Sequence, residues 1–407
     1  MRKFKAAAVV ATALAVLLSM TGCGLTTFDN FKATFIDKEK NKVESIQIGV
    51  LEPVTGADSQ DASKEIRGMQ IAAKVHPEVN GKKVELVFAD NKSDIYSTET
   101  AVETLLAKEP EVILGSYGSV YSLAAGDKIR DAGIPAIAAT NTNPLVTKNN
   151  PYYFRVCYAD AKQGALLARY VLESRNEKTA GILGPENDDA ATAIAKEFKD
   201  KMRQSTDNED AILYNESYKA GDKDFTDQLE KLKVSGVKAV LLPGDLADSQ
   251  AIISQAAKMN LDVQFLGDTE WGDKSFLKGI SAGGASEQVA FVQFFSGDGE
   301  VVESSVALEQ EAFSRMAAEE GLTKQEMEDD RVALGYDAYM VAISAIETAG
   351  DGAEGKDIKA VLADQSQTYV GVSGIIRFDS YGDPVKTAYI NTWDNGSQKT
   401  LYTVEGK

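Results

Sequence analysis

From residue 45 onward, apolar strand-like runs alternate regularly with helix-like segments, and this rhythm limits the possible folds more than any other feature. Runs such as 45–51 (SIQIGVL) and 111–115 (EVILG) are followed by segments with apolar residues at helical spacing, such as 63–75 (SKEIRGMQIAAKV). Continuous apolar strands that alternate with amphipathic helices are typical of parallel sheets covered by helices on both faces. The sequence therefore predicts an α/β fold with parallel sheets.

The alternation occurs twice along the chain. A first run ends near a connection at 150–160 (NPYYFRVCYAD), and a second run follows it. Two helical stretches, 302–320 and 331–349, come after the second run, and the chain ends in short β-like pieces. We therefore expect two doubly wound α/β units, each of a size that folds alone.

The first 44 residues do not share this rhythm. Arg2, Lys3 and Lys5 precede the apolar run 6–18, which is shorter than the roughly 20 residues needed to cross a bilayer as a helix. A basic start, a short apolar core and small residues after it are typical of a secretory signal. Thr21-Gly22-Cys23 resembles the lipobox of bacterial lipoproteins, in which cleavage precedes a lipid-carrying cysteine.

We therefore expect a signal peptide at 1–22, lipidation at Cys23 and a membrane tether at 23–44. The alternative is an ordinary secreted protein in which Cys23 is incidental. The first interpretation predicts a protein anchored by its lipid to the outer face of the cell membrane, as in Gram-positive lipoproteins.

Charge and cysteine content exclude some classes of protein. The net charge is −19, and such a surface repels phosphate backbones, so we expect no nucleic-acid partner. The chain has 2 cysteines, and once Cys23 is lipidated Cys157 has no partner for a disulfide. Cys157 lies in an apolar stretch, and we interpret it as a small core residue.

Motifs for catalysis are missing from the sequence. It contains no G-x-x-x-x-G-K-[ST] phosphate loop and no H-E-x-x-H. The segment 279–283 (GISAG) has the G-x-S-x-G spacing, but no helix of the right kind follows it, so we interpret it as a loop. The only histidine, His76, precedes a proline at a predicted helix end, where we expect it to be solvated. One histidine and one free cysteine do not make the common zinc sites. We expect no enzyme, cofactor or metal, although an enzyme that uses carboxylates alone stays an alternative.

Hydroxyl-rich loops follow two predicted strands. The segment after 111–115 places Ser116 and Ser119 at the start of a helix, and the segment 139–144 (ATNTNP) follows the next strand. Ligands of open α/β sheets bind beyond the carboxyl ends of strands, and a helix N-terminus attracts a carboxylate. Each loop alone could serve only as a helix cap or turn. Two such loops on neighbouring strands favour a binding site.

Several stretches together resemble a known family. They include 46–56 (IQIGVLEPVTG), 115–147, 333–347 and 369–383. In this order they are similar to the type I periplasmic binding proteins of ABC importers, specifically the branched-chain amino acid (leucine, isoleucine and valine) branch. The resemblance covers about 46–383.

That resemblance implies two lobes joined by a three-strand hinge, which close around one ligand. Lobe 1 would comprise 45–157 plus 292–366, and lobe 2 would comprise 158–291 plus 367–407. The closed form would dock on an ABC permease in the membrane, and we expect the protein to be a monomer.

The resemblance also implies which residues bind the ligand. Ser119, Thr140 and Thr142 would hold the α-carboxylate and ammonium of an amino acid, with Tyr117 and Asn141 beside them in the same loops. An acidic residue of the GDTEW loop, Asp268 or Glu270, would meet the ammonium group.

At three positions the chain departs from the family. Asp61, Asp189 and Asp245 stand where amino acid-binding relatives commonly have aromatic residues. Aspartates would not provide the roughly 1.5–3 kcal/mol that an aliphatic side chain gains on burial. We therefore expect a ligand more polar than a branched aliphatic amino acid, such as a cationic one. Alternatively, aromatic residues line the pocket; the candidates are Tyr117, Tyr121 and Trp271.

Taken together, the sequence predicts a substrate-binding lipoprotein of an ABC importer whose ligand is a small amino acid or a related polar molecule. The second hypothesis is a ligand-sensing receptor module with the same fold.

Overall fold

The computed structural model describes residues 45–281, 288–299, 301 and 303–406. The predicted signal peptide (1–22), the lipidation site Cys23 and the tether (23–44) lie outside the described residues. Within the described part, every helix is too short or too polar to span a membrane.

The first half of the chain forms a six-stranded sheet with the order β2-β3-β1-β4-β5-β6. Strand β1 pairs in parallel with β3 and β4, and β5 pairs in parallel with β4 and β6. Ile48 and Val50 of β1 are fully buried, as expected for a strand covered on both faces. The strands are β1 (Ile46–Glu52), β2 (Glu78–Val79), β3 (Lys82–Asp90), β4 (Val112–Gly115), β5 (Ala136–Ala138) and β6 (Tyr153–Arg155).

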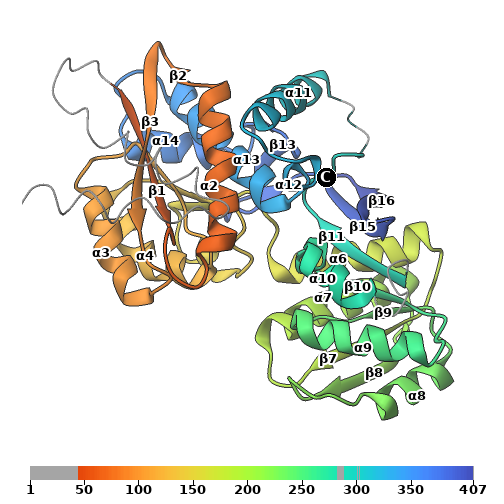
Figure 1. Cartoon of the computed structure of the whole chain (residues 1–407). Coiled ribbons are helices and arrows are strands. Elements are labelled where there is room, and N and C mark those ends of the chain that lie inside the picture. Colours follow the sequence, from red (N-terminus) through yellow and green to blue (C-terminus); the bar gives the residue numbers. More distant parts are fainter. Residues whose placement is uncertain (1–44, 282–287, 300, 302, 407) are drawn as a thin grey trace, which may run out of the picture. The chain divides into compact units, whose positions relative to one another are not determined.

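Helices connect these strands and cover the sheet (Figure 1). Helix α3 begins where the Asp94 carboxylate accepts a hydrogen bond of 2.7 Å from the Ser97 N–H. Helix α4 begins after Gly118, whose φ of 85° is a conformation that glycine adopts without strain. The helices are α2 (Ser59–Val75), α3 (Ile95–Leu106), α4 (Ser119–Ala132) and α5 (Leu145–Lys148).

A second, seven-stranded sheet has the order β16-β15-β11-β10-β9-β7-β8. Strands β7 to β11 pair in parallel, whereas β15 and β16 from the end of the chain add antiparallel strands next to β11. The strands are β7 (Ala180–Pro185), β8 (Ile212–Tyr218), β9 (Ala239–Leu241), β10 (Gln264–Gly267), β11 (Val289–Gln293), β15 (Ala388–Asp394) and β16 (Ser397–Val404).

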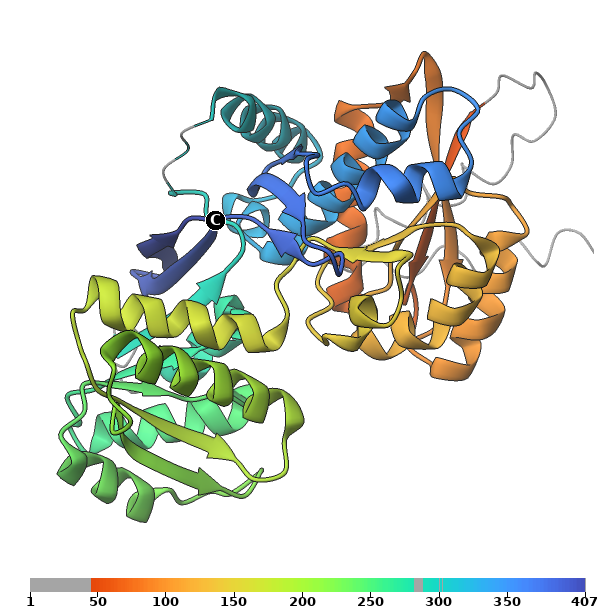
Figure 2. The ribbon, with the colours of Figure 1, turned by 180° about the vertical axis from the view of Figure 1, so that it is seen from behind.

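Helices α6 and α7 lie side by side on this sheet and appear in yellow and yellow-green in Figure 2. A π-helical turn, Tyr170–Ser174, extends α6. The other helices are α6 (Asp160–Arg169), α7 (Asp189–Thr206), α8 (Thr226–Ser235), α9 (Leu246–Lys258), the 3₁₀ turn η2 (Thr269–Gly272) and α10 (Lys274–Ser281). Two parallel-dominated sheets with covering helices confirm the predicted α/β fold class.

Of the remaining elements, α11 and α13 pack against α2 of the first sheet. A small antiparallel sheet comprises β12 (Tyr369–Gly371), β13 (Gly374–Phe378) and β14 (Pro384–Val385), and β12 contacts α13. The sequence placed this segment in lobe 2, whose exact boundaries stay a prediction. The helices are α11 (Ser304–Glu319), α12 (Lys324–Met327), α13 (Asp330–Ala349) and α14 (Gly355–Leu362).

Helices α2 and α13 approach each other through glycines. A Cβ atom added to Gly68 would lie 2.0 Å from the Val332 carbonyl oxygen, and one added to Gly335 would lie 2.2 Å from the Glu65 carbonyl oxygen. Because the clash would be with backbone, neither position accepts a larger residue without moving a helix. Gly68 and Gly335 therefore set the spacing of the two helices.

A buried lysine joins segments from three parts of the chain. The Lys386 ammonium group is fully buried, donates to Ser373 Oγ and to the Val156 carbonyl, and lies 3.7 Å from Asp337. Tyr158 accepts a hydrogen bond of 3.0 Å from the Lys386 N–H. Burial lowers the pKa of Lys386, and the Asp337 carboxylate opposes this shift. The junction ties the segment after β6 to α13 and to the C-terminal strands.

Candidate functional site

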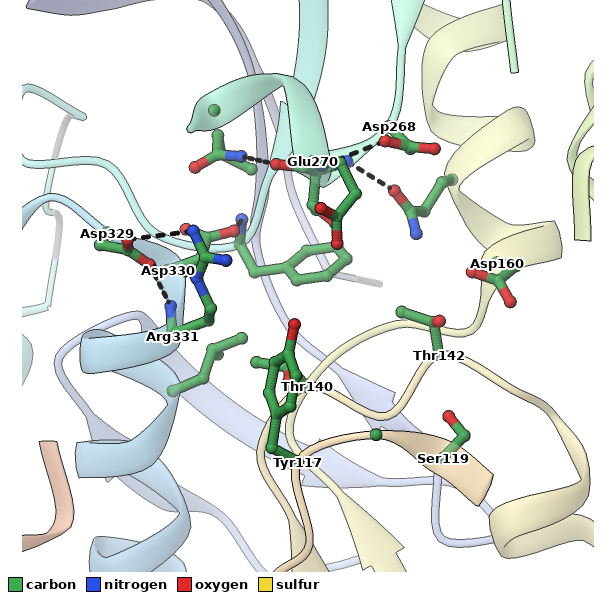
Figure 3. A pocket seen from close by; sticks show the side chains of 17 residues that line it. Tyr117, Ser119, Thr140, Thr142, Asp160, Asp268, Glu270, Asp329, Asp330 and Arg331 are labelled. Carbon is green, nitrogen blue, oxygen red and sulfur yellow. Dashed lines mark hydrogen bonds and ion pairs between the residues drawn. The ribbon is translucent and has the colours of Figure 1, made fainter. Parts of the chain in front are cut away.

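A cavity of about 240 Å³ lies where strand ends and helix starts converge (Figure 3). The loops after β4, β5 and β10 contribute to it, together with the first turns of α6 and α13. Its lining residues are Tyr117, Gly118, Ser119, Thr140, Thr142, Asp160, Gln163, Asp268, Thr269, Glu270, Gly272, Gln293, Phe294, Asp329, Asp330, Arg331 and Leu334.

One wall of the cavity carries hydroxyl groups. Ser119 is the first residue of α4, and its Oγ accepts a hydrogen bond of 3.3 Å from the Asn143 N–H, which leaves its own proton available. Thr142 follows β5 and lies beside Ser119, and the Tyr117 ring projects into the cavity (Figure 3). The N-cap position of α4, Gly118, provides no side-chain cap, so the Ser119 and Val120 amides can meet an anion, whereas the Tyr121 N–H donates to the Gly118 carbonyl over 3.1 Å.

Thr140 is used differently from Ser119. Its hydroxyl donates to the carboxylate of the buried Glu65 behind the wall. A threonine hydroxyl has one proton and two lone pairs, so toward the cavity Thr140 acts as an acceptor. Thr140 therefore suits an ammonium group better than a carboxylate.

The opposite wall carries carboxylates. The loop after β10 provides Asp268 and Glu270, and the first turn of α6 provides Asp160. Asp268 accepts a hydrogen bond of 3.0 Å from the Glu270 N–H. The Glu270 side chain points toward the tip of Tyr117 (Figure 3), and its carboxylate has no protein partner among the described contacts.

Two glutamines hold the acidic loop in place. The Thr269 N–H donates to Gln163 Oε1 over 3.1 Å, and Gln293 Nε2 donates to the Thr269 carbonyl over 3.0 Å. Both glutamines are nearly fully buried. Asp268 and Glu270 are thus presented on a turn that is fixed from two sides.

Burial disfavours the ionised form of the carboxyl groups in the acidic wall. Burial, and then the neighbouring Glu270 charge, raises the pKa of Asp268 to about 7. Burial also raises the pKa of Glu270, although the positive charge of Arg331 opposes the shift. The pKa of Asp160 is raised by burial too, against a hydrogen bond from Thr142. A cationic group that enters the cavity would compensate these carboxylates.

The start of α13 contributes a carboxylate that is already satisfied. Asp330 accepts hydrogen bonds of 2.7 Å and 3.0 Å from the N–H groups of Phe294 and Phe295. Burial nevertheless raises the pKa of Asp330 to about 7. Its two oxygens fasten the end of β11 to α13, so Asp330 shapes the cavity without offering a free acceptor.

Arg331 is the cation that lines the cavity, and acidic side chains surround it. Its guanidinium group lies 2.8 Å from Asp61, 2.7 Å from Asp273 and 2.9 Å from Asp329. Lys64 contacts the same three carboxylates at distances between 3.1 and 3.3 Å. These five residues form an ion cluster beside the cavity. Because Arg331 is committed to this cluster, the wall that would hold an anion relies on uncharged donors.

The structure gathers six of the predicted residues around the cavity, namely Tyr117, Ser119, Thr140, Thr142, Asp268 and Glu270. Asn141 lies behind the wall instead, buried, with its amide donating to the Ser116 carbonyl over 2.8 Å. Whether any of these residues contacts a ligand stays a prediction.

The three aspartates at the predicted aromatic positions do not line the cavity. Asp61 belongs to the ion cluster. Asp189 is exposed in the first turn of α7, and Asp245 is exposed at the start of α9, where it accepts a hydrogen bond of 2.7 Å from the Ala247 N–H. The cavity is acidic, but its carboxylates are Asp160, Asp268 and Glu270.

Of the alternative aromatic residues, only Tyr117 lines the cavity. Tyr121 donates to Asp58 over 2.6 Å, and Trp271 is fully buried and stacked on Phe276 with ring centroids 4.5 Å apart. Cys157 is fully buried, as predicted for a core residue, and burial raises the pKa of its thiol to about 12. His76 is not freely solvated, because its Nε2 lies 2.8 Å from Glu309.

Sequence reasoning missed several lining residues. Asp160 ends a predicted connection, Gln163 follows it, and Arg331 opens a predicted helix, but no local pattern marks them as binding residues. One usable signal was the pair of acidic residues at 329–330, directly before the helix, since such residues often occupy helix starts.

Comparison with solved structures places this geometry among known binding proteins. A crystal structure of a leucine-binding protein LivK from Thermotoga maritima matches with a TM-score of 0.71 and 26% identity, covering 88% of this chain and 99% of that one. The branched-chain amino acid transporter substrate-binding protein LivJ from Streptococcus pneumoniae, in complex with isoleucine, matches with a TM-score of 0.69 and 27% identity over the same shares.

Two curated relatives align with this chain over different shares of their length. A Leu/Ile/Val-binding protein homolog 2 from Brucella abortus is 28% identical over 225 residues, which is 54% of this chain and 60% of that protein. The aligned part thus spans less than two thirds of that relative. A leucine-, isoleucine-, valine-, threonine- and alanine-binding protein from Pseudomonas aeruginosa is 26% identical over 348 residues, 84% of this chain and 87% of the relative.

The family model described as periplasmic binding protein matches residues 45–398, which include every strand of the two large sheets except most of β16 and every residue that lines the cavity. The chain therefore belongs to the periplasmic binding protein family.

Proposed function

We propose that this protein is the extracytoplasmic substrate-binding component of an ABC importer and that it binds an amino acid in the cavity. The observation that carries the proposal is the division of the cavity into a wall of uncharged donors and a wall of carboxylates. An amino acid carries one anionic and one cationic group, and burial of both requires such partners.

The two walls suit the two ends of a zwitterion. The Ser119 hydroxyl and the amides at the start of α4 would hold the α-carboxylate, whereas the Thr142 hydroxyl donates to Asp160 and would offer only an acceptor. Glu270 would hold the ammonium group, with the Thr140 hydroxyl oxygen as an additional acceptor. The cavity is below the roughly 300–1,000 Å³ usual for drug-sized ligands, which fits a small molecule.

The relatives support an amino acid as the ligand class. Their names refer to leucine, isoleucine, valine, threonine and alanine, and one of the matched structures holds isoleucine. Asp160 and Asp268 add two carboxylates to the one that an ammonium group needs. We therefore propose an amino acid with further hydrogen-bond donors, such as a cationic side chain.

Anchoring and partners complete the proposal. Lipidation of Cys23 would hold the protein at the outer face of the cell membrane, where it would act as a monomer that delivers its ligand to a permease. The lobes would close on the ligand by hinge motion, with boundaries near those predicted from the sequence. We propose no catalytic role. The sensing-receptor alternative shares the ligand site and differs in having no permease partner.

A thermal-shift screen tests the ligand class. The purified protein would be screened against the twenty amino acids, ornithine, amides and polyamines, and mass spectrometry would identify any molecule that co-purifies with it. We expect lysine, ornithine or another donor-rich amino acid to stabilise the protein most. Leucine as the sole strong stabiliser would refute the donor-rich ligand, and no shift from any amino acid would refute the amino acid site.

A transport assay separates the importer from the receptor. Uptake of the identified amino acid into cells would be compared with and without the gene for this protein. We expect uptake at low concentration to depend on the protein, whereas unchanged uptake favours the receptor.

A further inference from the structure

Two glutamates lie directly behind the hydroxyl-bearing wall. Glu52 is the last residue of β1, Glu65 lies on α2, and both are fully buried with an exposed fraction of 0%. Neither forms an ion pair with any of the residues that the structure describes. Two buried carboxyl groups without a cation in contact need another explanation for their stability.

Two of their four oxygens have clear partners. Glu52 Oε2 accepts a hydrogen bond of 2.7 Å from the Tyr117 N–H, and Glu65 Oε1 accepts the hydroxyl proton of Thr140. The other two oxygens, Glu52 Oε1 and Glu65 Oε2, are buried and receive no donor from any other group. The two side chains lie within hydrogen-bonding reach of each other.

A single proton would satisfy both carboxyl oxygens that lack a donor. If a single proton lies between Glu52 Oε1 and Glu65 Oε2, one carboxyl group donates to the other and both oxygens are satisfied. Two ionised carboxylates within hydrogen-bonding reach of each other, in a site buried from water, would repel each other strongly. The geometry therefore favours a pair that carries one proton and one negative charge.

This pair also fixes two groups at the cavity. Through Glu52 it holds the backbone of Tyr117, and through Glu65 it takes the proton of Thr140, so that the lone pairs of Thr140 face the cavity. Both Tyr117 and Thr140 line the cavity, whereas the glutamates themselves do not. Glu52 and Glu65 thus act on a ligand only through these neighbours.

We propose that Glu52 and Glu65 are positioning residues that share one proton, and that loss of this proton weakens ligand binding in the cavity. This role rests on the amino acid site proposed above, although the sharing of the proton does not depend on it.

The surroundings determine the direction of the pH effect. Burial, and then the charge of Glu65, raises the pKa of Glu52 well above its usual range, and burial raises the pKa of Glu65 to about 7. The other charged or titratable groups that interact with the pair are Arg331 of α13, Asp329 just before that helix, Tyr153 of β6, Cys157 and Tyr117. The pKa of about 7 belongs to Glu65, which takes up a second proton below it, whereas the raised pKa of Glu52 keeps the shared proton on the pair above pH 7. This contribution to affinity is therefore present near neutral pH and decreases as pH rises through the raised pKa of Glu52.

Conservative amide variants isolate the effect. Glu65→Gln and Glu52→Gln each replace the shared proton with a permanent N–H donor and keep the acceptor for Thr140 or Tyr117. Glu111→Gln is the matched control, because Glu111 is a half-buried glutamate of the same region that accepts one backbone N–H over 2.7 Å and has no carboxyl partner.

The main measurement is the Kd of the amino acid that gives the largest thermal shift in the screen above. The ratio of the wild-type Kd to the Glu65→Gln Kd would be followed from about pH 7 to pH 10.5, since this ratio cancels the titration of Asp268 and Glu270. We expect a ratio near one at pH 7 that rises with pH, by about tenfold once the shared proton is lost. A ratio that stays constant while the protein binds overturns the inference and leaves the proposed function intact.

The double variant provides a second test. In Glu52→Gln/Glu65→Gln the two amide oxygens would accept from Tyr117 and Thr140. The two amide NH₂ groups would then face each other, so that each meets a donor and no acceptor. We expect each single variant to melt within a few degrees of wild type. We expect the melting temperature of the double variant to fall by much more than the sum of the two single decreases. Additive melting temperatures contradict a proton-sharing pair.

A ligand-free measurement decides the proton itself. Carbon-13 NMR of labelled glutamate carboxyl groups would be recorded during a pH titration. We expect the pair to give two glutamate carboxyl signals that titrate at about pH 7 or above in wild type and in Glu111→Gln, and only one such signal in each single pair variant. If every glutamate titrates below about pH 6, no proton is shared. If instead no amino acid binds at all, the proposed function fails while this titration still reports on the pair.

Discussion

The loops after β4 and β5 bring hydroxyl groups to the cavity, whereas the loop after β10 and the start of α6 bring carboxylates. The first wall is uncharged at its surface, because its buried acids, Glu52 and Glu65, lie behind the lining residues Tyr117 and Thr140. The second wall exposes acids whose pKa values are raised by burial, as for Asp268.

This difference indicates how a charged ligand can be held and released. Neutral donors and helix amides stabilise an anion without a permanent counter-ion, so they cost little when the site is empty. Buried carboxylates are costly without a cation, so the acidic wall gains most from an ammonium group. We therefore expect the acidic wall to dominate affinity.

The largest effect should come from Glu270. We expect Glu270→Gln to raise the Kd for the amino acid about 100-fold, since loss of a charged partner for a buried ammonium costs about 2–3 kcal/mol. Asp268→Asn should raise it less than about tenfold, because Asp268 already accepts the Glu270 N–H. Calorimetry near pH 8 measures both, with melting temperatures as the control for folding. A larger loss for Asp268→Asn would assign the ammonium to Asp268 instead.

Substitution of Arg331 tests whether uncharged donors alone bind the anionic group of the ligand. Arg331→Met removes a cation from contact with three carboxylates, and we expect it to lower the free energy of unfolding by about 2 kcal/mol. The loss is below that of a fully buried pair because the cluster is partly exposed and Lys64 remains. Denaturant unfolding measures it. A Kd that rises 100-fold would mean that Arg331 binds the ligand's anionic group.

The acidic wall also predicts a pH dependence of stability. The folded pKa of Asp268 is about 7, above its value in the unfolded chain, so its stabilising contribution is complete below about pH 4 and decreases as pH rises to about 7. Asp268→Asn should therefore flatten the decrease of the unfolding free energy over this range, by at most about 1.4 kcal/mol per pH unit. An unchanged slope would place the Asp268 carboxyl in water.

The smallest effects should come from the two exposed aspartates. Asp189→Asn and Asp245→Asn lie outside the cavity lining and retain hydrogen-bonding side chains at their helix starts. We expect each to change the Kd by less than about twofold. Losses of tenfold or more would show that these residues reach the ligand when it is bound, and the acidic wall would then be larger than the cavity described.

Much of the fold was predictable because it is encoded locally. The run 111–115 was predicted as a strand and contains β4 (Val112–Gly115), since its apolar and β-branched side chains leave little ambiguity. Ser119, Thr140 and Thr142 were predicted to lie together because the carboxyl ends of neighbouring parallel strands share one edge of a sheet.

The electrostatics were not predictable in the same way. Asp61 looked like a pocket residue, but its hydrogen-bond partner Arg331 lies 270 residues away in the chain. No short pattern indicates which distant cation will neutralise a given aspartate. The same holds for Glu52 and Glu65, whose pairing depends on where α2 crosses β1 rather than on any motif.

The glycine contact between α2 and α13 has a consequence for how the chain folds. Gly68 and Gly335 bring the two helix backbones together, yet all of residues 76–329 lie between these helices in the chain. During synthesis, the face of α2 that packs on α13 therefore stays uncovered until α13 itself has been made. Contacts of such long sequence separation form slowly. A chain stopped before α13 should remain prone to aggregation and to proteolysis within α2.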